Sequence, residues 1–242
     1  MKIEMRIGTI SVYLGWDFFM LRTMEENRMK KLTDEEKQGV YKAIFNRRDI
    51  RTFINQPVED ETLMRVLEAA HSAPSVGFMQ PWNFIIIKDE NIKRKLAEAV
   101  EKERRALAIH YEETERELKF LDLKIAGILE APITICVTNN PFSAGDHVLG
   151  RNSIPETDIM STSCAIQNMW LASYAEGLAM GWVSFYKKDD VRRILEIPYH
   201  VDPVALLSIG YTDHYPDRPL LEIYKWEKRQ QLDTLIFENK WT

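Results

Sequence analysis

Residues 69–88, AAHSAPSVGFMQPWNFIIIK, decide how the middle of this chain folds. Pro74 ends the helix before it, because proline lacks an N–H group and clashes with the preceding helical turn. The small residues around Gly77 allow a tight turn with exposed backbone N–H groups, which suits a phosphate or a flat polar ring. The apolar run at 84–87 then predicts a strand. This order of helix, polar turn and strand is either a binding turn or only a well-formed connection.

A second polar segment, RRDIR at residues 47–51, follows a predicted helix that starts at Thr33 with three acidic residues behind it. Three guanidinium groups within five residues make a concentrated anion site, because arginine can hold phosphate oxygens by paired hydrogen bonds. The same pattern also occurs at solvated helix ends. The cations should keep Asp49 ionised unless burial opposes them.

Periodicity and turn residues predict the remaining elements. The expected helices are at residues 57–73, 91–130 with a break near 110–114, 158–176 and 189–195, and the expected further strands are at 133–137, 180–185 and 204–210. The helix at 158–176 has few charges, which favours deep burial. The loop at 139–157 is long enough to cover a pocket. Strands between helices predict an α+β or α/β sandwich.

Composition excludes several classes of protein. The chain has 242 residues, with 37 acidic against 32 basic side chains, and this balance argues against a general nucleic-acid-binding protein. Cys136 and Cys164 form neither a disulfide framework nor a metal-binding spacing, and both are expected as buried free thiols. We therefore expect a cytoplasmic protein with no metal site. No apolar run is long enough to predict a membrane span.

The first thirty residues differ from the rest of the chain. They are rich in methionine, and we interpret residues 1–30 as an N-terminal extension of uncertain status. Either translation begins later, at Met24 or Met29, or the segment is an arm that packs on a partner. Residues 31–242 are expected to form a single domain.

Four segments carry a resemblance to a known family: RRDIR at 47–51, HSAPSVGFMQPWNF at 71–84, LGRNSIPETDIMSTSCAIQNMWLA at 149–172 and AEGLAMGWVSF at 175–185. They resemble the FMN-dependent nitroreductase family, and most closely its 5,6-dimethylbenzimidazole synthase branch. The resemblance covers about residues 35–242. It implies a nitroreductase-like α+β fold with a mixed sheet flanked by helices. It also implies an intertwined homodimer with FMN at the interface.

The resemblance further implies a reaction and its residues. In that branch, reduced FMN reacts with molecular oxygen and is cut down to 5,6-dimethylbenzimidazole, the lower ligand of vitamin B12. Asp49 is implied as the acid/base group and Ser161 as its hydroxyl partner, although Ser163 adds a second hydroxyl and leaves open which serine acts. The implied cofactor-binding residues are Arg47, Arg48, Asp49, Ile50, Arg51, His71, Pro74, Ser75, Gly77, Gln80, Trp82, Gly181, Trp182, Val183, Ser184 and Arg229.

Two other functions fit the same resemblance. One is an NAD(P)H-dependent nitroreductase, or a flavin or cob(II)yrinate reductase, that recycles its FMN. The other is a flavin-binding protein without turnover. If the protein is the synthase, NAD(P)H either binds this chain directly or serves a partner flavin reductase that supplies reduced FMN. Neither a nucleic acid nor a membrane is expected as a partner.

Overall fold

The computed structural model describes residues 31–241, so the predicted extension at 1–30 lies outside the described residues. From Lys42 onward the chain forms one compact unit. Helix α2 (Asp34–Asn46) begins as predicted. The Thr33 N–H donates to Glu36 Oε2 at 2.7 Å, and the Glu36 N–H donates to Thr33 Oγ1 at 3.2 Å. This reciprocal pair satisfies two N–H groups that a helix start otherwise leaves without partners.

A four-stranded sheet forms the centre of the unit. Its order is β1–β2–β4–β3, and its strands are β1 (Trp82–Ile87), β2 (Ile133–Asn139), β3 (Ala179–Val183) and β4 (Asp202–Gly210). All pairings between these strands are antiparallel. One parallel bridge joins Asp49 to Met180 beside the β3 edge. The predicted sandwich of strands and helices is therefore confirmed, with the parallel component of the sheet confined to this bridge among the described residues.

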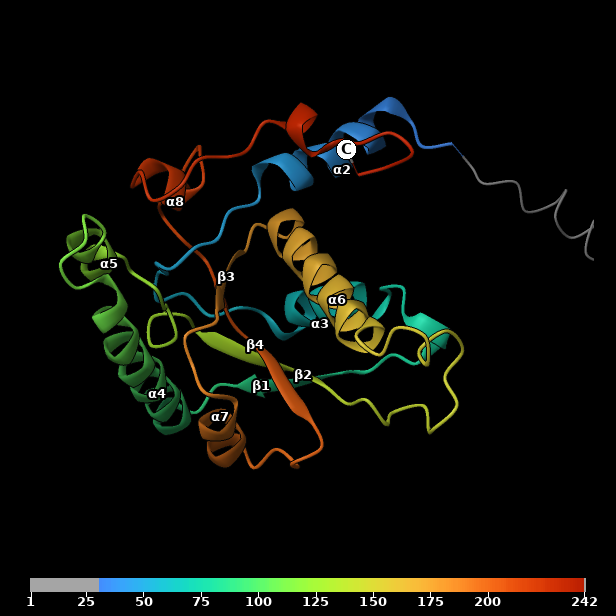
Figure 1. Ribbon diagram of the computed structural model, residues 1–242, viewed down its shortest axis with the longest axis horizontal. Coiled ribbons are helices and arrows are strands. Elements are labelled where there is room, and N and C mark those ends of the chain that lie inside the picture. The colour runs from blue at the N-terminus through green and yellow to red at the C-terminus, as the bar shows by residue number, and fades with distance from the viewer. Residues whose placement is uncertain (1–30, 242) are drawn as a thin grey trace, which may run out of the picture. The chain divides into compact units, whose positions relative to one another are not determined.

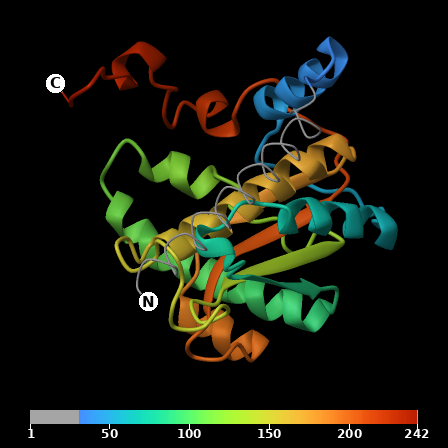
Figure 2. The same ribbon diagram turned by 90° about the vertical axis from the view of Figure 1, so that its right-hand side faces the viewer.

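Helices cover both faces of the sheet (Figure 1). Helices α3 (Asp60–His71) and α6 (Thr157–Ala175) lie side by side on one face, as both views show (Figure 2). Their apolar residues, such as Val66 and Ile166, are fully buried against Ile135 and Leu207 of the sheet. Helices α4 (Glu90–Ala108) and α7 (Lys188–Leu195) cover the other face. Two hydrophobic cores thus lie on the two faces of the sheet.

Two sequence predictions were wrong in this region. The second half of the charged segment was expected to be helical up to residue 130, but α5 (Glu117–Asp122) ends much earlier. In the segment that follows, Gly127 packs closely, because a Cβ atom there would lie 2.6 Å from the Phe53 ring and 2.8 Å from the Arg51 carbonyl oxygen. The chain crosses this crowded place as an extended loop. Cys136 is buried as expected, whereas Cys164 is exposed on α6.

The remaining elements are short. They are η1 (Val76–Phe78), η2 (Ile109–Tyr111), α8 (Leu220–Ile223) and η3 (Leu232–Leu235). In the C-terminal tail, Trp226 packs against Tyr111 and Phe120, so part of the aromatic content of the tail docks on its own chain. Within residues 31–241, no helix has the length and apolar character that a bilayer crossing requires.

Candidate active site

The arginine arm, which we define as residues 47–51, leaves α2 and runs beside β3. The Ile50 N–H donates to the Met180 carbonyl oxygen at 3.0 Å, and Ile50 itself is buried. Gly181 makes this approach possible, because a Cβ atom on it would lie 2.0 Å from the Ile50 carbonyl oxygen. The glycine of the predicted strand therefore lets the arm pack directly against the sheet.

Asp49 is held from two sides. Its Oδ1 accepts a hydrogen bond from the Trp182 N–H at 2.9 Å, and its Oδ2 pairs with Arg51 Nη2 at 2.5 Å. Burial raises the pKa of the Asp49 carboxyl above its ordinary value, although Arg51, the Trp182 N–H and Arg47 act to lower it. The expected effect of the cations is present, but desolvation outweighs it. Asp49 is thus a fixed carboxyl group that holds a proton more readily than an ordinary aspartate.

Arg48 supports the arm itself. Its guanidinium donates to the carbonyl oxygens of Phe45 at 2.8 Å and of Arg47 at 2.9 Å, and also to that of Asp217. Its backbone N–H donates to the Tyr215 hydroxyl at 2.7 Å. These bonds tie the arm to the segment after β4, so most of the donors of Arg48 are already used within the chain.

Arg47 differs from Arg48. Its guanidinium lies 4.7 Å above the centre of the Trp170 ring on α6, while the Trp170 indole N–H donates to the Arg48 carbonyl oxygen at 3.2 Å. Among the described residues, no acceptor forms a hydrogen bond with the Arg47 guanidinium. Arg47 is therefore a positioned cation whose N–H groups remain available to an anion.

A cavity of about 450 Å³ opens beside Asp49. Its lining includes the polar side chains of Asp49, Arg51 and Ser184 and several aromatic rings. Arg51 Nη1 is buried and has no hydrogen-bond partner among the described residues. The volume falls in the usual range of small-molecule sites. The aromatic residues that line the cavity are Tyr111, Phe120, Phe185, Tyr224 and Trp226.

The serine turn, which we define as residues 74–80, lies elsewhere. Ser161 of α6 accepts a hydrogen bond from the Val76 N–H at 3.0 Å and donates to the Thr157 carbonyl oxygen at 2.5 Å. Ser75 Oγ accepts from the Gln80 N–H at 3.1 Å. Ser161 thus connects the turn that follows Pro74 to the start of α6, as a serine bonded to its own helix.

The backbone of the serine turn is strained. Gly77, Phe78 and Gln80 all adopt positive φ angles, of 50°, 55° and 47°. Phe78 and Gln80 have side chains, so this conformation is costly for them and is held only by its surroundings. Phe78 is 81% exposed. The turn therefore presents a fixed apolar side chain on the surface of the chain.

The segments that carry the two predicted catalytic residues meet α6 at different points. The arginine arm contacts Trp170, whereas the serine turn contacts Ser161, nine residues earlier on the same helix. At a rise of 1.5 Å per residue, these contacts are about 13 Å apart along the axis. Within one chain, the two segments therefore meet different parts of α6, and Ser161 does not line the Asp49 cavity.

The other predicted residues are distributed between these two regions and the tail. The Trp82 indole N–H donates to His71 Nδ1 at 3.1 Å, which links the end of α3 to β1. Val183 is buried in the sheet, next to Trp182. Arg229 lies in the tail, where it lines a separate hollow of about 810 Å³ with other charged side chains. The structure does not bring Arg229 to the Asp49 cavity.

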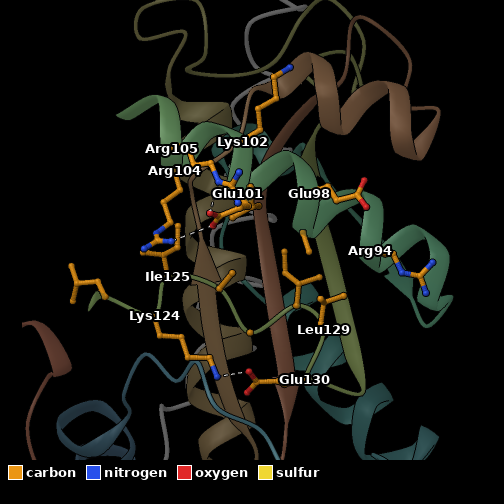
Figure 3. Close-up of a pocket in the computed structure, with 16 residues that line it drawn as sticks. Arg94, Glu98, Glu101, Lys102, Arg104, Arg105, Lys124, Ile125, Leu129 and Glu130 are labelled. Carbon is orange, nitrogen blue, oxygen red and sulfur yellow. Dashed lines mark hydrogen bonds and ion pairs between the residues drawn. The ribbon is translucent and has the colours of Figure 1, made fainter. Parts of the chain in front are cut away.

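Another hollow, of about 670 Å³, lies between α4 and the loop at 123–130 (Figure 3). Its charged residues pair with one another, as Arg105 and Arg104 do with Glu101, and Lys124 with Glu130. No predicted site residue lines it. This hollow therefore does not compete with the Asp49 cavity as the candidate site, although it is larger.

Sequence reasoning missed several residues of the Asp49 region. Tyr215 and Trp170 support the arginine arm, and Tyr111 and Phe120 line the cavity. They lie between 60 and 170 residues from Asp49 along the chain, so no local pattern connects them with it.

Comparison with known proteins agrees with this geometry. Residues 44–211 match the sequence profile of the nitroreductase family. The chain is 35% identical over 189 residues to a 5,6-dimethylbenzimidazole synthase of Rhodospirillum rubrum, covering 78% of this chain and 89% of that protein.

Two solved structures share the fold. An iodotyrosine deiodinase bound to FMN and 3-iodo-L-tyrosine matches with a TM-score of 0.65 at 19% identity, over 84% of this chain and 100% of that one. A BluB-like flavoprotein from Clostridium difficile matches with a TM-score of 0.62 at 21% identity, over 83% and 99%. The expected fold class is confirmed, and the chain belongs to the nitroreductase family.

Proposed function

We propose that the protein binds FMN and converts reduced FMN, with molecular oxygen, to 5,6-dimethylbenzimidazole. The observation that carries the proposal is Asp49, a desolvated carboxyl that is fixed between Arg51 and the Trp182 N–H and lines a cavity. The relative from Rhodospirillum rubrum, which is a 5,6-dimethylbenzimidazole synthase, supports this choice of reaction.

The residues of the arginine arm fit a flavin mononucleotide. Arg47 has available N–H donors, and Arg51 Nη1 is a buried donor without a partner in the described part of the chain. Such groups suit the phosphate and the carbonyl oxygens of the ligand. Gly181 keeps the arm against β3, so these donors are held in place before a ligand arrives.

Asp49 would act on protons at this site. Bound reduced FMN would supply electrons to oxygen, and its own ring would be the material that is cut down. Asp49 would accept or return a proton, because its raised pKa brings it closer to the pH at which the reaction runs. The Trp182 N–H and Arg51 would orient its two oxygens, and the surrounding aromatic residues would exclude water.

We also propose that the protein is a homodimer in which the serine turn of one copy completes the site of the other. Within one chain, the arginine arm contacts α6 at Trp170, whereas the serine turn contacts it nine residues earlier, at Ser161. Phe78, Leu149 and Met160, which lie on or near the serine turn, are 81%, 86% and 55% exposed. Burying such side chains against a second copy is favourable. Sedimentation at low concentration tests this, and a folded monomer would contradict it.

The reaction is tested by incubating the protein with chemically reduced FMN in air and determining the products by mass spectrometry. Formation of 5,6-dimethylbenzimidazole supports the proposal. If only oxidised FMN and peroxide appear over many turnovers, the synthase function is excluded. Oxidation of NAD(P)H with a nitroaromatic acceptor would then identify a recycling reductase. The product assay is then repeated with NAD(P)H in place of the chemical reductant. Product formation would indicate that NAD(P)H serves this chain directly, whereas its absence would indicate that a partner reductase supplies reduced FMN.

A further inference from the structure

Trp170 of α6 lies beside the arginine arm, and its side chain meets the arm in two ways. The indole N–H donates to the Arg48 carbonyl oxygen at 3.2 Å. The Arg47 guanidinium lies 4.7 Å from the centre of the indole ring. A single side chain of the helix therefore contacts both residues that precede Asp49 in the chain.

The bond to the Arg48 carbonyl acts on the backbone of Asp49. That carbonyl belongs to the peptide group between residues 48 and 49. The next peptide group, between residues 49 and 50, is held by the Ile50 N–H, which donates to the Met180 carbonyl oxygen at 3.0 Å. Because peptide groups are planar, bonding both of those that flank Asp49 restricts the position of its Cα atom. Of these two bonds, the one from Trp170 is made by a side chain, so a substitution can remove it.

Trp170 also contacts the residue that orients the Asp49 carboxyl. The rings of Trp170 and Trp182 pack together, with centroids 6.3 Å apart and planes 50° apart. The Trp182 N–H donates to Asp49 Oδ1 at 2.9 Å. Both indole rings pack against the hydrophobic core between the sheet and helices α3 and α6. Trp170 thus connects this core to the strand residue that holds the carboxyl.

We propose that Trp170 is the positioning residue of the site, which holds the Arg47 cation for the flavin phosphate and the Asp49 carboxyl for proton transfer in one fixed arrangement. This inference rests on the proposed function. It assigns a separate role to each part of the Trp170 side chain. The ring positions the cation, because the electron-rich face of an indole attracts a guanidinium. The N–H positions the backbone that carries the carboxyl.

Flavin titration of the full-length protein tests the role of the ring. Trp170→Leu removes the ring and should weaken binding of FMN about tenfold, whereas binding of riboflavin, which lacks the phosphate, should stay at the wild-type level. Trp170→Phe keeps an aromatic face for Arg47 and should stay within about threefold of wild type for both flavins. Equal weakening of FMN and riboflavin binding in Trp170→Leu contradicts this role, as does unchanged binding of both.

Hydrogen exchange of the FMN-free protein tests the role of the N–H, and it needs neither flavin nor turnover. Trp170→Phe removes the indole donor, so the Trp182 amide should exchange about tenfold faster, while amides in the pairing of β2 with β4 keep their wild-type rates. Met169→Ala is the control for lost packing, because Met169 is fully buried next to Trp170 on α6. It should speed exchange of the sheet amides without a preferential effect on the Trp182 amide.

The product assay at saturating reduced FMN completes the test. Trp170→Phe should lower the rate of product formation about tenfold or more although it still binds FMN, because a displaced proton-transfer group loses its alignment. A wild-type exchange rate of the Trp182 amide in Trp170→Phe overturns the inference, as does faster exchange that only follows that of the sheet. If the wild type forms no 5,6-dimethylbenzimidazole but the Trp182 amide responds as expected, the proposed function fails and Trp170 still positions Asp49.

Discussion

The arginine arm and the serine turn are held against the core of the unit in different ways. Each is a polar segment bonded to a core element, and each involves a glycine at a close approach: Gly181 of β3 faces the arm, and Gly77 of the turn faces the loop at 148–149. The arm lies beside β3 and meets a cavity, with a carboxyl group whose pKa is raised by burial. The turn lies on the start of α6, projects Phe78 outward and stores backbone strain. The difference indicates that the arm contains the chemistry, whereas the turn presents a surface.

The largest expected effect is at Asp49. Asp49→Asn keeps the size of the side chain and an acceptor for the Trp182 N–H but removes the proton acceptor. The rate of 5,6-dimethylbenzimidazole formation should fall about 10²–10⁴-fold, the usual contribution of a positioned acid/base group, while FMN binding persists. Product mass spectrometry and FMN titration measure the two effects. Asp146→Asn, in the loop before α6, is the control. A variant at Asp49 that keeps more than a tenth of the rate would contradict the assignment.

Alanine substitutions test the two close approaches, at Gly181 and Gly77, against the open position at Gly145. Gly181→Ala places a Cβ atom 2.0 Å from the Ile50 carbonyl oxygen, so the arm must move, at an expected cost of about 3 kcal/mol. Gly77→Ala places one 2.7 Å from Val148 Cγ1 and 2.8 Å from the backbone nitrogen and oxygen of Leu149, at a φ of +50°, so it should also cost about 3 kcal/mol. Gly145→Ala meets nothing within 4 Å and should cost about 1 kcal/mol from its positive φ alone. Urea unfolding measures all three, and an equal loss in the three variants would refute the distinction.

The two serines of α6 test whether the turn is held as described. Ser161→Ala leaves the Val76 N–H without its acceptor and should cost about 1–3 kcal/mol of unfolding free energy. Ser163 is exposed and bonds only to the Ile159 carbonyl oxygen of its own helix, so Ser163→Ala should change stability by less than about 0.5 kcal/mol. Thermal or urea unfolding checks this. Equal losses in both variants would show that Ser161 does not hold the turn.

Within the arm, Arg47 and Arg48 are expected to separate binding from stability. Arg47→Ala removes an available cation and should weaken FMN binding about tenfold without lowering stability. Arg48→Ala removes donors to three backbone carbonyls and should lower stability as well as binding. Arg193→Ala, on an exposed face of α7, is the control for lost charge. Unchanged FMN affinity in both arm variants would mean that the phosphate does not bind here.

The smallest effect concerns pH. Because the pKa of Asp49 is higher in the folded than in the unfolded chain, the folded state binds more protons between the two values. The stability contributed by Asp49 is therefore complete below its ordinary pKa of 3.8 and is lost as the pH rises through the raised value. The difference in unfolding free energy between wild type and Asp49→Asn should decrease over that interval. A difference that grows with pH would show that the cations dominate instead.

The sequence predicted the elements better than the contacts between them. Local capping and turn residues account for the start of α2 after Thr33 and the end of α6 before Gly177. Apolar runs account for the four strands. The close packing of Gly127 in the segment after α5 could not be predicted, because its neighbour Phe53 lies 74 residues earlier in the chain.

The candidate site shows the same limit. The segments with arginine and serine were recognisable as polar turns beside core elements. Their separation along α6 could not be predicted, because it depends on which part of the helix each segment contacts. The contact between Tyr111 and Trp226 could not be predicted either, because the two residues meet only after the tail folds back. The exposure of Cys164 depends on the rotation of α6 about its axis, which its weakly charged sequence does not determine.

The position of the two regions at different points of α6 has a genetic consequence. In the proposed dimer, each site takes its arm from one copy and its turn from the other. A chain defective at Asp49 and a chain whose serine turn cannot complete the partner's site would each be inactive as pure dimers. When the two are mixed, a hybrid dimer carries both lesions in one site and none in the other. Two inactive alleles would therefore complement each other, and a random mixture would recover about a quarter of the normal activity, as expected when half of the dimers are hybrids with one intact site.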